Sequence, residues 1–109
     1  MKTAMQGTSL RAYFDDVLPE IDGKRREVLR VLIDDQTMDF TNMELAEELV
    51  WSINRVTPRV FELRGRDKRF PLRRPILVES RRRRCSVTGT TAIAWQINPE
   101  LHPGGYKID

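Results

Sequence analysis

The sequence predicts an α+β fold in which three to four helices precede a C-terminal β-hairpin. Between residues 10 and 63 apolar residues recur at intervals of three and four, which places them on one face of each helix. From residue 85 to residue 97 the period falls to two, as in a half-buried strand. A chain of 109 residues is long enough for one small domain with a single core.

The first expected helix spans residues 10–18, after a cap at Thr8 or Ser9 and before Pro19. Its apolar residues are Leu10, Tyr13, Phe14, Val17 and Leu18. One side of a helix cannot easily bury all five, so we expect residues 1–21 to contribute to a homodimer interface.

The second expected helix follows a cap at Asp22 and supports the rest of the domain. Its apolar side carries Val28, Leu29, Leu32 and Ile33, and its polar side carries Lys24, Arg25 and Glu27. A short strand is expected next, at residues 38–40.

Residues 41–64 predict two short helices joined by a tight turn. Thr41 and Glu44 have the spacing of a capping box, so the first of these helices starts at Asn42. Phe40 precedes the cap and can pack on Leu45 as a hydrophobic staple. The apolar stripe of this helix consists of Leu45, Ala46 and Leu49.

The turn between these helices has Val50 where glycine is usual. A β-branched residue with positive φ is strained, so we expect a tighter or differently shaped turn. Two starts of the following helix fit the sequence. With Ser52 as the cap, Pro58 falls inside the helix and removes a hydrogen bond; with Thr57 as the cap, Pro58 occupies the favoured first position.

The second of these helices presents a polar face that suits the DNA major groove. Val56, Val60 and Leu63 are expected to face inward, leaving Arg59 and Glu62 among the outward residues. Arginine can chelate guanine and asparagine can chelate adenine. We therefore expect base-edge contacts from Asn54, Arg55, Thr57 and Arg59.

Charge is segregated along the chain. Residues 1–54 hold 6 basic and 11 acidic side chains, whereas residues 55–84 hold 12 basic and 3 acidic ones. A basic segment of this kind is typical of a face that binds the phosphates of nucleic acid. Arginine, which dominates here, matches phosphate better than lysine does. Backbone contacts are expected from Arg64, Arg66, Lys68, Arg69, Arg73, Arg74, Arg81, Arg82, Arg83 and Arg84.

Residues 65–75 contain two prolines and four arginines, which predict a mobile basic loop that orders on DNA. The β-hairpin that follows, which we call the wing, has its turn centred on Gly89 and a bulge or bend expected near residues 80–82. Its inner face is expected to hold Cys85, Val87, Ile93 and Trp95. Its outward face is expected to hold Arg82, Arg84 and Ser86.

The order of helices and wing resembles the winged helix-turn-helix superfamily, and more closely a group of small phage and prophage proteins. Residues 54–60, 62–64 and 83–89, followed by Ala92, Ile93 and Trp95, carry the resemblance. It implies sequence-specific binding of double-stranded DNA, commonly as a dimer, by a small transcriptional regulator. The expected organisation is an N-terminal helix in 1–21, a winged-helix domain in 22–98 and a flexible tail in 99–109.

Other classes have less support in the sequence. His102 is the only histidine and Cys85 the only cysteine, so we expect no enzyme activity, no metal and no cofactor. No apolar run approaches a membrane span and no secretion signal is visible, so a cytoplasmic location is expected. Two alternatives stay open: an interaction module for an acidic protein, and an RNA binder that uses the arginine-rich loop with Phe70 for stacking.

Overall fold

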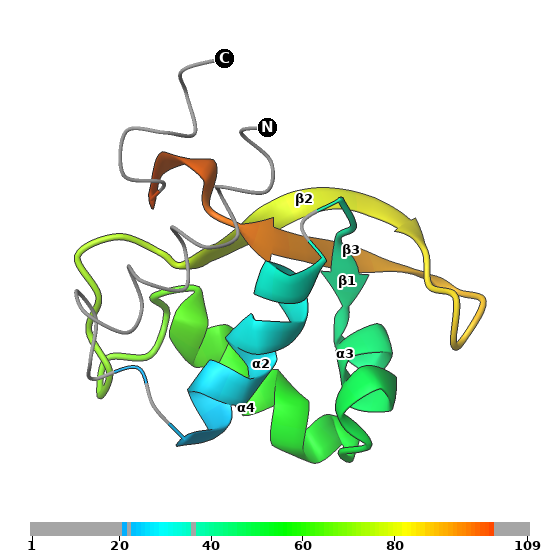
Figure 1. Ribbon diagram of the computed structural model, residues 1–109, viewed down its shortest axis with the longest axis horizontal. Helices are drawn as coiled ribbons and strands as arrows, with labels where there is room; N and C mark the ends of the chain where they lie inside the picture. Colours follow the sequence, from blue (N-terminus) through cyan, green and yellow to red (C-terminus); the bar gives the residue numbers. More distant parts are fainter. Residues whose placement is uncertain (1–20, 22, 36, 102–109) are drawn as a thin grey trace.

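A computed structural model of the chain describes residues 21, 23–35 and 37–101 (Figure 1). The elements are α2 (Gly23–Asp34), β1 (Phe40–Thr41), α3 (Asn42–Leu49), α4 (Ile53–Leu63), β2 (Leu77–Arg84), β3 (Thr91–Ile97) and the 3-10 helix η2 (Pro99–Leu101). Three helices followed by an antiparallel hairpin make an α+β, winged-helix-like topology, as predicted. The helix expected at residues 10–18, with its dimer interface, lies outside the described residues.

The sheet has the strand order β1-β3-β2 and is antiparallel throughout. The short strand expected at residues 38–40 is observed at Phe40–Thr41, where Phe40 pairs with Trp95 and Thr41 with Ala94. The three helices gather on one side of this sheet (Figure 1). The two strands of the wing, β2 and β3, therefore belong to a sheet whose remaining strand, β1, leads directly into α3.

The core lies between the helices and the sheet. The four residues predicted for the apolar side of α2, Val28, Leu29, Leu32 and Ile33, are buried. Each fully buried aliphatic side chain contributes about 1.5–3 kcal/mol. Leu101 of η2 is also part of this core. Residues 99–101, which the sequence assigned to a flexible tail, are therefore packed, because Leu101 supplies an apolar side chain that the core buries.

The capping box at the start of α3 is confirmed. The Glu44 backbone N–H donates to Thr41 Oγ1 at 3.2 Å, and the Thr41 N–H donates to Glu44 Oε1 at 3.0 Å. Thr41 is also the last residue of β1, so the strand passes into the helix without a linker. A cap of this kind contributes about 1 kcal/mol.

The turn between α3 and α4 has the strained left-handed geometry, so the prediction of a tighter or differently shaped turn was wrong. Val50 has φ 57 and ψ 43, the left-handed region, and its side chain is 89% exposed. This conformation lets the Trp51 N–H reach the Ala46 carbonyl at 2.9 Å, the long bond of a Schellman motif. The last carbonyl groups of α3 are thus hydrogen-bonded by a turn of the glycine type, although the residue in the left-handed position is the β-branched Val50.

Helix α4 starts at Ile53 with Ser52 in the cap position, so Pro58 lies inside the helix and the alternative start at Thr57 is wrong. The Ser52 carbonyl accepts from the N–H groups of Arg55 and Val56, although its side chain makes no capping bond. Since Pro58 has no N–H, the Asn54 carbonyl lacks the usual donor from one turn ahead.

The wing contains the predicted bulge, seen as a register shift between Glu79 and Arg81. Strand β2 ends at Arg84, and the loop of residues 85–90 is closed by the Cys85 N–H, which donates to the Thr90 carbonyl at 2.8 Å. Cys85 is buried as predicted, but Val87 is exposed. The expectation of an inward Val87 was wrong because the strand ends before it and Val87 belongs to the turn.

We predict that Val50→Gly raises the free energy of unfolding by about 1 kcal/mol, because glycine removes the steric cost of the left-handed conformation. Chemical denaturation of both proteins measures the difference. Val87→Gly is the matched control, since Val87 is also an exposed valine in a turn but has no positive φ. The control should lose stability, because glycine adds backbone freedom without relieving any strain. An equal loss in Val50→Gly would show that Val50 is not strained.

Candidate nucleic-acid interface

Helix α4 presents one continuous exposed stripe. Asn54, Thr57, Pro58 and Phe61 are all exposed and recur at intervals of three and four, so they share a face. Phe61 is 45% exposed although it is a large aromatic residue. Asn54 and Thr57 were predicted to lie on this surface, whereas Phe61 and Pro58 were not. Their spacing from Asn54 was the signal that could have found them.

Arg59 lies beside this stripe but its guanidinium is already bound. Its Nε and Nη2 donate to the two carboxylate oxygens of Glu62, each at 2.8 Å. Arg25 of α2 donates from Nε to the same carboxylate at 2.9 Å. Glu62 was expected to point outward, which is wrong: it is buried beneath two arginines. The sequence could not indicate this, because Arg25 reaches it from another helix.

The electrostatics of Glu62 reflect this enclosure. Burial by itself raises the pKa of the carboxyl, but hydrogen bonds and charge from Arg59 and Arg25 outweigh it, so the pKa is lowered.

Arg55 is placed differently from Arg59, with its guanidinium carbon 4.5 Å from the centre of the Trp51 ring. Its side chain stays exposed beside the turn that precedes α4.

The bulge in β2 decides which arginines share a face of the wing. Beyond it, Arg82 pairs with Ile93 and Arg84 with Thr91. Directly opposed residues of antiparallel strands project to the same side, so Arg82 and Arg84 share the face of Ile93 and Trp95. The expectation that they face away from Ile93 and Trp95 was therefore wrong. The register beyond the bulge pairs even-numbered residues of β2 with odd-numbered residues of β3, whereas the sequence analysis placed Cys85 and Val87 on the face of Ile93 and Trp95.

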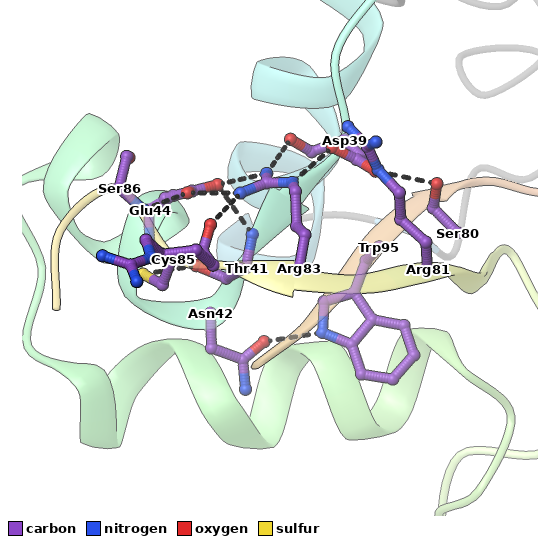
Figure 2. A network of polar contacts seen from close by, with 11 residues as sticks. Asp39, Thr41, Asn42, Glu44, Ser80, Arg81, Arg83, Cys85, Ser86 and Trp95 are labelled. Atoms are coloured by element: carbon purple, nitrogen blue, oxygen red, sulfur yellow. Dashed lines mark hydrogen bonds and ion pairs between the residues drawn. The ribbon is translucent and has the colours of Figure 1, made fainter. Parts of the chain in front are cut away.

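Trp95 links this face of the wing to the helices. It is buried, as predicted, and its Nε1 donates to Asn42 Oδ1 at 2.9 Å (Figure 2). The Asn42 amide nitrogen lies 3.5 Å from Thr57 Oγ1 on the exposed side of α4. Arg64, at the end of α4, places its guanidinium 4.5 Å from the centre of the Trp95 ring. The exposed stripe of α4 and the Trp95 face of the wing are thus connected through Asn42 of α3.

The opposite face of the wing carries a network of ion pairs (Figure 2). Arg83 donates to both carboxylate oxygens of Glu44 at 2.7 and 2.8 Å, and from Nε to Asp39 at 3.0 Å. Ser80 and Arg81 also donate to Asp39, and the Ser86 N–H donates to Glu44. The Arg83 side chain is only 19% exposed. Its guanidinium, which was predicted to bind phosphate, is already bound by two protein carboxylates.

These contacts shift the ionisation of the network. Hydrogen bonds from Arg83, together with the N–H groups of Ser86 and Thr41, outweigh burial and lower the pKa of Glu44 to about 2. Burial of Asp39 opposes its ionisation, but hydrogen bonds from Arg81, Ser80 and Arg83 lower its pKa to about 2 as well. The pKa of Arg83 is raised by the same partners. All three groups therefore stay charged near neutrality.

The basic loop of residues 65–75 is anchored at two points. Phe70 and Leu72 are partly buried against the core, and the Arg25 guanidinium carbon lies 3.9 Å from the centre of the Phe70 ring. Arg69 bonds to Asp67, and Arg74 donates to the Glu100 carbonyl at 3.3 Å. Within the described ranges, six members of the predicted phosphate-binding set make no side-chain hydrogen bond or ion pair: Arg64, Arg66, Lys68, Arg73, Arg82 and Arg84.

No family model, curated protein sequence or solved structure matches the chain. Among the residues that the structure describes, no group of three histidine, cysteine or acidic side chains could hold a metal ion. No helix in that part of the chain is long and apolar enough to cross a membrane.

The ion-pair network predicts a specific acid sensitivity. Asp39 and Glu44 have ordinary pKa values of 3.8 and 4.5, and folding lowers both to about 2. Their stabilisation is therefore complete above about pH 5 and is lost as the pH falls toward 2. We expect Glu44→Gln to lower the free energy of unfolding at pH 7 by about 3 kcal/mol and to flatten its decline between pH 5 and 2.

Glu47→Gln is the matched control, because Glu47 is an exposed residue of the same helix. Its substitution should change stability by less than about 0.5 kcal/mol. Denaturation followed at a series of pH values measures both. Equal effects of the two substitutions would mean that Glu44 does not hold the wing.

Proposed function

We propose that this protein binds double-stranded DNA, with α4 in the major groove and the wing on the adjacent backbone. One observation carries the proposal. The bulge in β2 places Arg82 and Arg84 on the face of the wing that holds Trp95 and, above its ring, Arg64. Neither Arg82 nor Arg84 has an ion-pair partner among the described residues.

Charge and shape support this assignment. The excess of basic residues in 55–84 includes the wing arginines and those of the loop that follows α4. Arginines without a protein ion-pair partner can neutralise DNA phosphates, and the release of the phosphates' counterions then favours binding. The exposed stripe of α4 lies on an element of the right diameter for the major groove. A winged-helix-like topology brings such a helix and such a hairpin together.

We further propose that binding is sequence-specific, as a small transcriptional regulator of the phage type requires. Phosphate contacts carry no sequence information, whereas side chains on an exposed helix face can read base edges. Asn54 and Thr57 on α4 are exposed for that purpose. In contrast, the Phe70 ring, which an RNA-binding loop would need for base stacking, is covered on one face by Arg25. This favours duplex DNA over single-stranded RNA.

The wing gives the direct test. Replacing Arg82 and Arg84 together with alanine should weaken binding to every duplex alike, because phosphate contacts are sequence-independent. The slope of log affinity against log salt should fall by about 0.9 for each contact that is lost. Fluorescence anisotropy on two unrelated duplexes at several salt concentrations measures the slope.

Arg81→Ala is the matched control, since Arg81 belongs to the same strand but bonds to Asp39 on the opposite face. It should leave the slope nearly unchanged. A slope that the double substitution does not alter would place Arg82 and Arg84 off the DNA. Tighter binding of single-stranded RNA or of an acidic protein than of duplex DNA, over the same salt series, would replace the proposal with that partner.

A further inference from the structure

We propose that α4 reads A·T base pairs, through thymine methyl groups and an adenine edge, and does not read guanine. This inference rests on the proposed function, since it assigns specificity to the same helix. It differs from the expectation that Arg55 and Arg59 contact bases. Two independent observations support it: the arginines of α4 are held away from the reading stripe, and the stripe itself combines an amide with apolar groups.

The first observation concerns the arginines. An arginine reads guanine by directing two N–H groups at O6 and N7. In Arg59, Nε and Nη2 are both bonded to the buried Glu62 carboxylate. Turning this fork toward a base would leave Glu62 with Arg25 alone, and removing one partner from a buried ion pair is costly. Arg55 stacks on Trp51 beside the turn and is outside the stripe.

The second observation concerns the stripe. Its members are Asn54, Thr57, Pro58 and Phe61, and none of them is charged. With a rise of 1.5 Å per residue, Asn54 and Phe61 are about 10 Å apart along the axis. That distance corresponds to about three stacked base pairs. The stripe is therefore long enough to meet several consecutive pairs on one side of the helix.

The chemistry of the stripe selects A·T pairs. The Asn54 side chain makes no hydrogen bond with other described residues, so its amide is available for N6 and N7 of adenine. Thymine is the base that presents a methyl group in the major groove, and it is contacted by apolar groups such as the threonine methyl and phenylalanine. Covering the half-exposed Phe61 ring with thymine methyls would remove apolar surface from water.

The experiment begins with selection of bound sequences from a random duplex pool by the full chain. The selected site should contain at least two adjacent A·T pairs. Each thymine is then replaced by uracil, which removes only the methyl group. We expect the affinity of the unaltered protein to fall about fourfold at one or two positions, the effect of losing one buried methyl. This measurement does not depend on how well any variant folds.

Variants assign the contacts. In Phe61→Ala and Phe61→Leu the penalty for uracil should shrink at one position, more strongly in the alanine protein. In Asn54→Ala, 7-deazaadenine, which lacks N7, should no longer weaken binding at its position. Met38→Ala is the control, because Met38 is an exposed apolar residue outside α4. It should keep every penalty of the unaltered protein.

A flat uracil scan, or a selected site of G·C pairs whose preference disappears in Arg59→Lys, would overturn the A·T assignment. Either result can occur while the salt slope still depends on Arg82 and Arg84, so the proposed DNA binding would stand. Absence of any duplex binding by the unaltered protein would instead reject both. The two proposals therefore fail in distinguishable ways.

Discussion

The ion pair between Glu44 and Arg83 joins the wing to the start of α3. Glu44 caps α3, accepts the Ser86 N–H from the wing loop and binds two nitrogens of Arg83 in β2. A shift of the wing relative to α3 would leave a buried carboxylate without its partners, which costs several kcal/mol. The position of the wing relative to α3 therefore depends on this carboxylate as well as on the pairing of β1 with β3.

A single extra residue in β2 decides which two of four consecutive arginines lie on the side of Leu77 and Glu79. The register shift sends Arg81 and Arg83 to the Asp39 side, where they are bonded to carboxylates (Figure 2). It sends Arg82 and Arg84 to the Trp95 side, where no described carboxylate neutralises them. Without the bulge, strict alternation would continue the face of Leu77 and Glu79 through Arg81 and Arg83. The register of β2 against β3 thus decides which arginines of the wing have no ion-pair partner among the described residues.

Two residues at the proposed reading surface adopt backbone positions that their residue types disfavour. Val50 holds a left-handed conformation just before α4, and Pro58 lies within the helix on its exposed stripe. Both cost stability that surrounding packing must supply, from Val56, Val60 and Leu63 on the buried side. Such local exceptions concentrate at functional sites in proteins, because selection there acts on the surface that is presented.

The sequence alone determined the elements that depend on short-range chemistry. Helical spacing indicated the buried residues of α2 and α4, the Thr41 and Glu44 spacing gave the start of α3, and the bulge in β2 was expected near its observed place. The tertiary structure decided which arginines are free. Arg59 and Arg83 are bonded to Glu62 and Glu44, carboxylates that also bond to residues of other elements. The register of β2 against β3 turns Arg82 and Arg84 toward the face of Trp95. Charge and period are visible in a sequence, but the pairing of charges across elements appears only when the chain is folded.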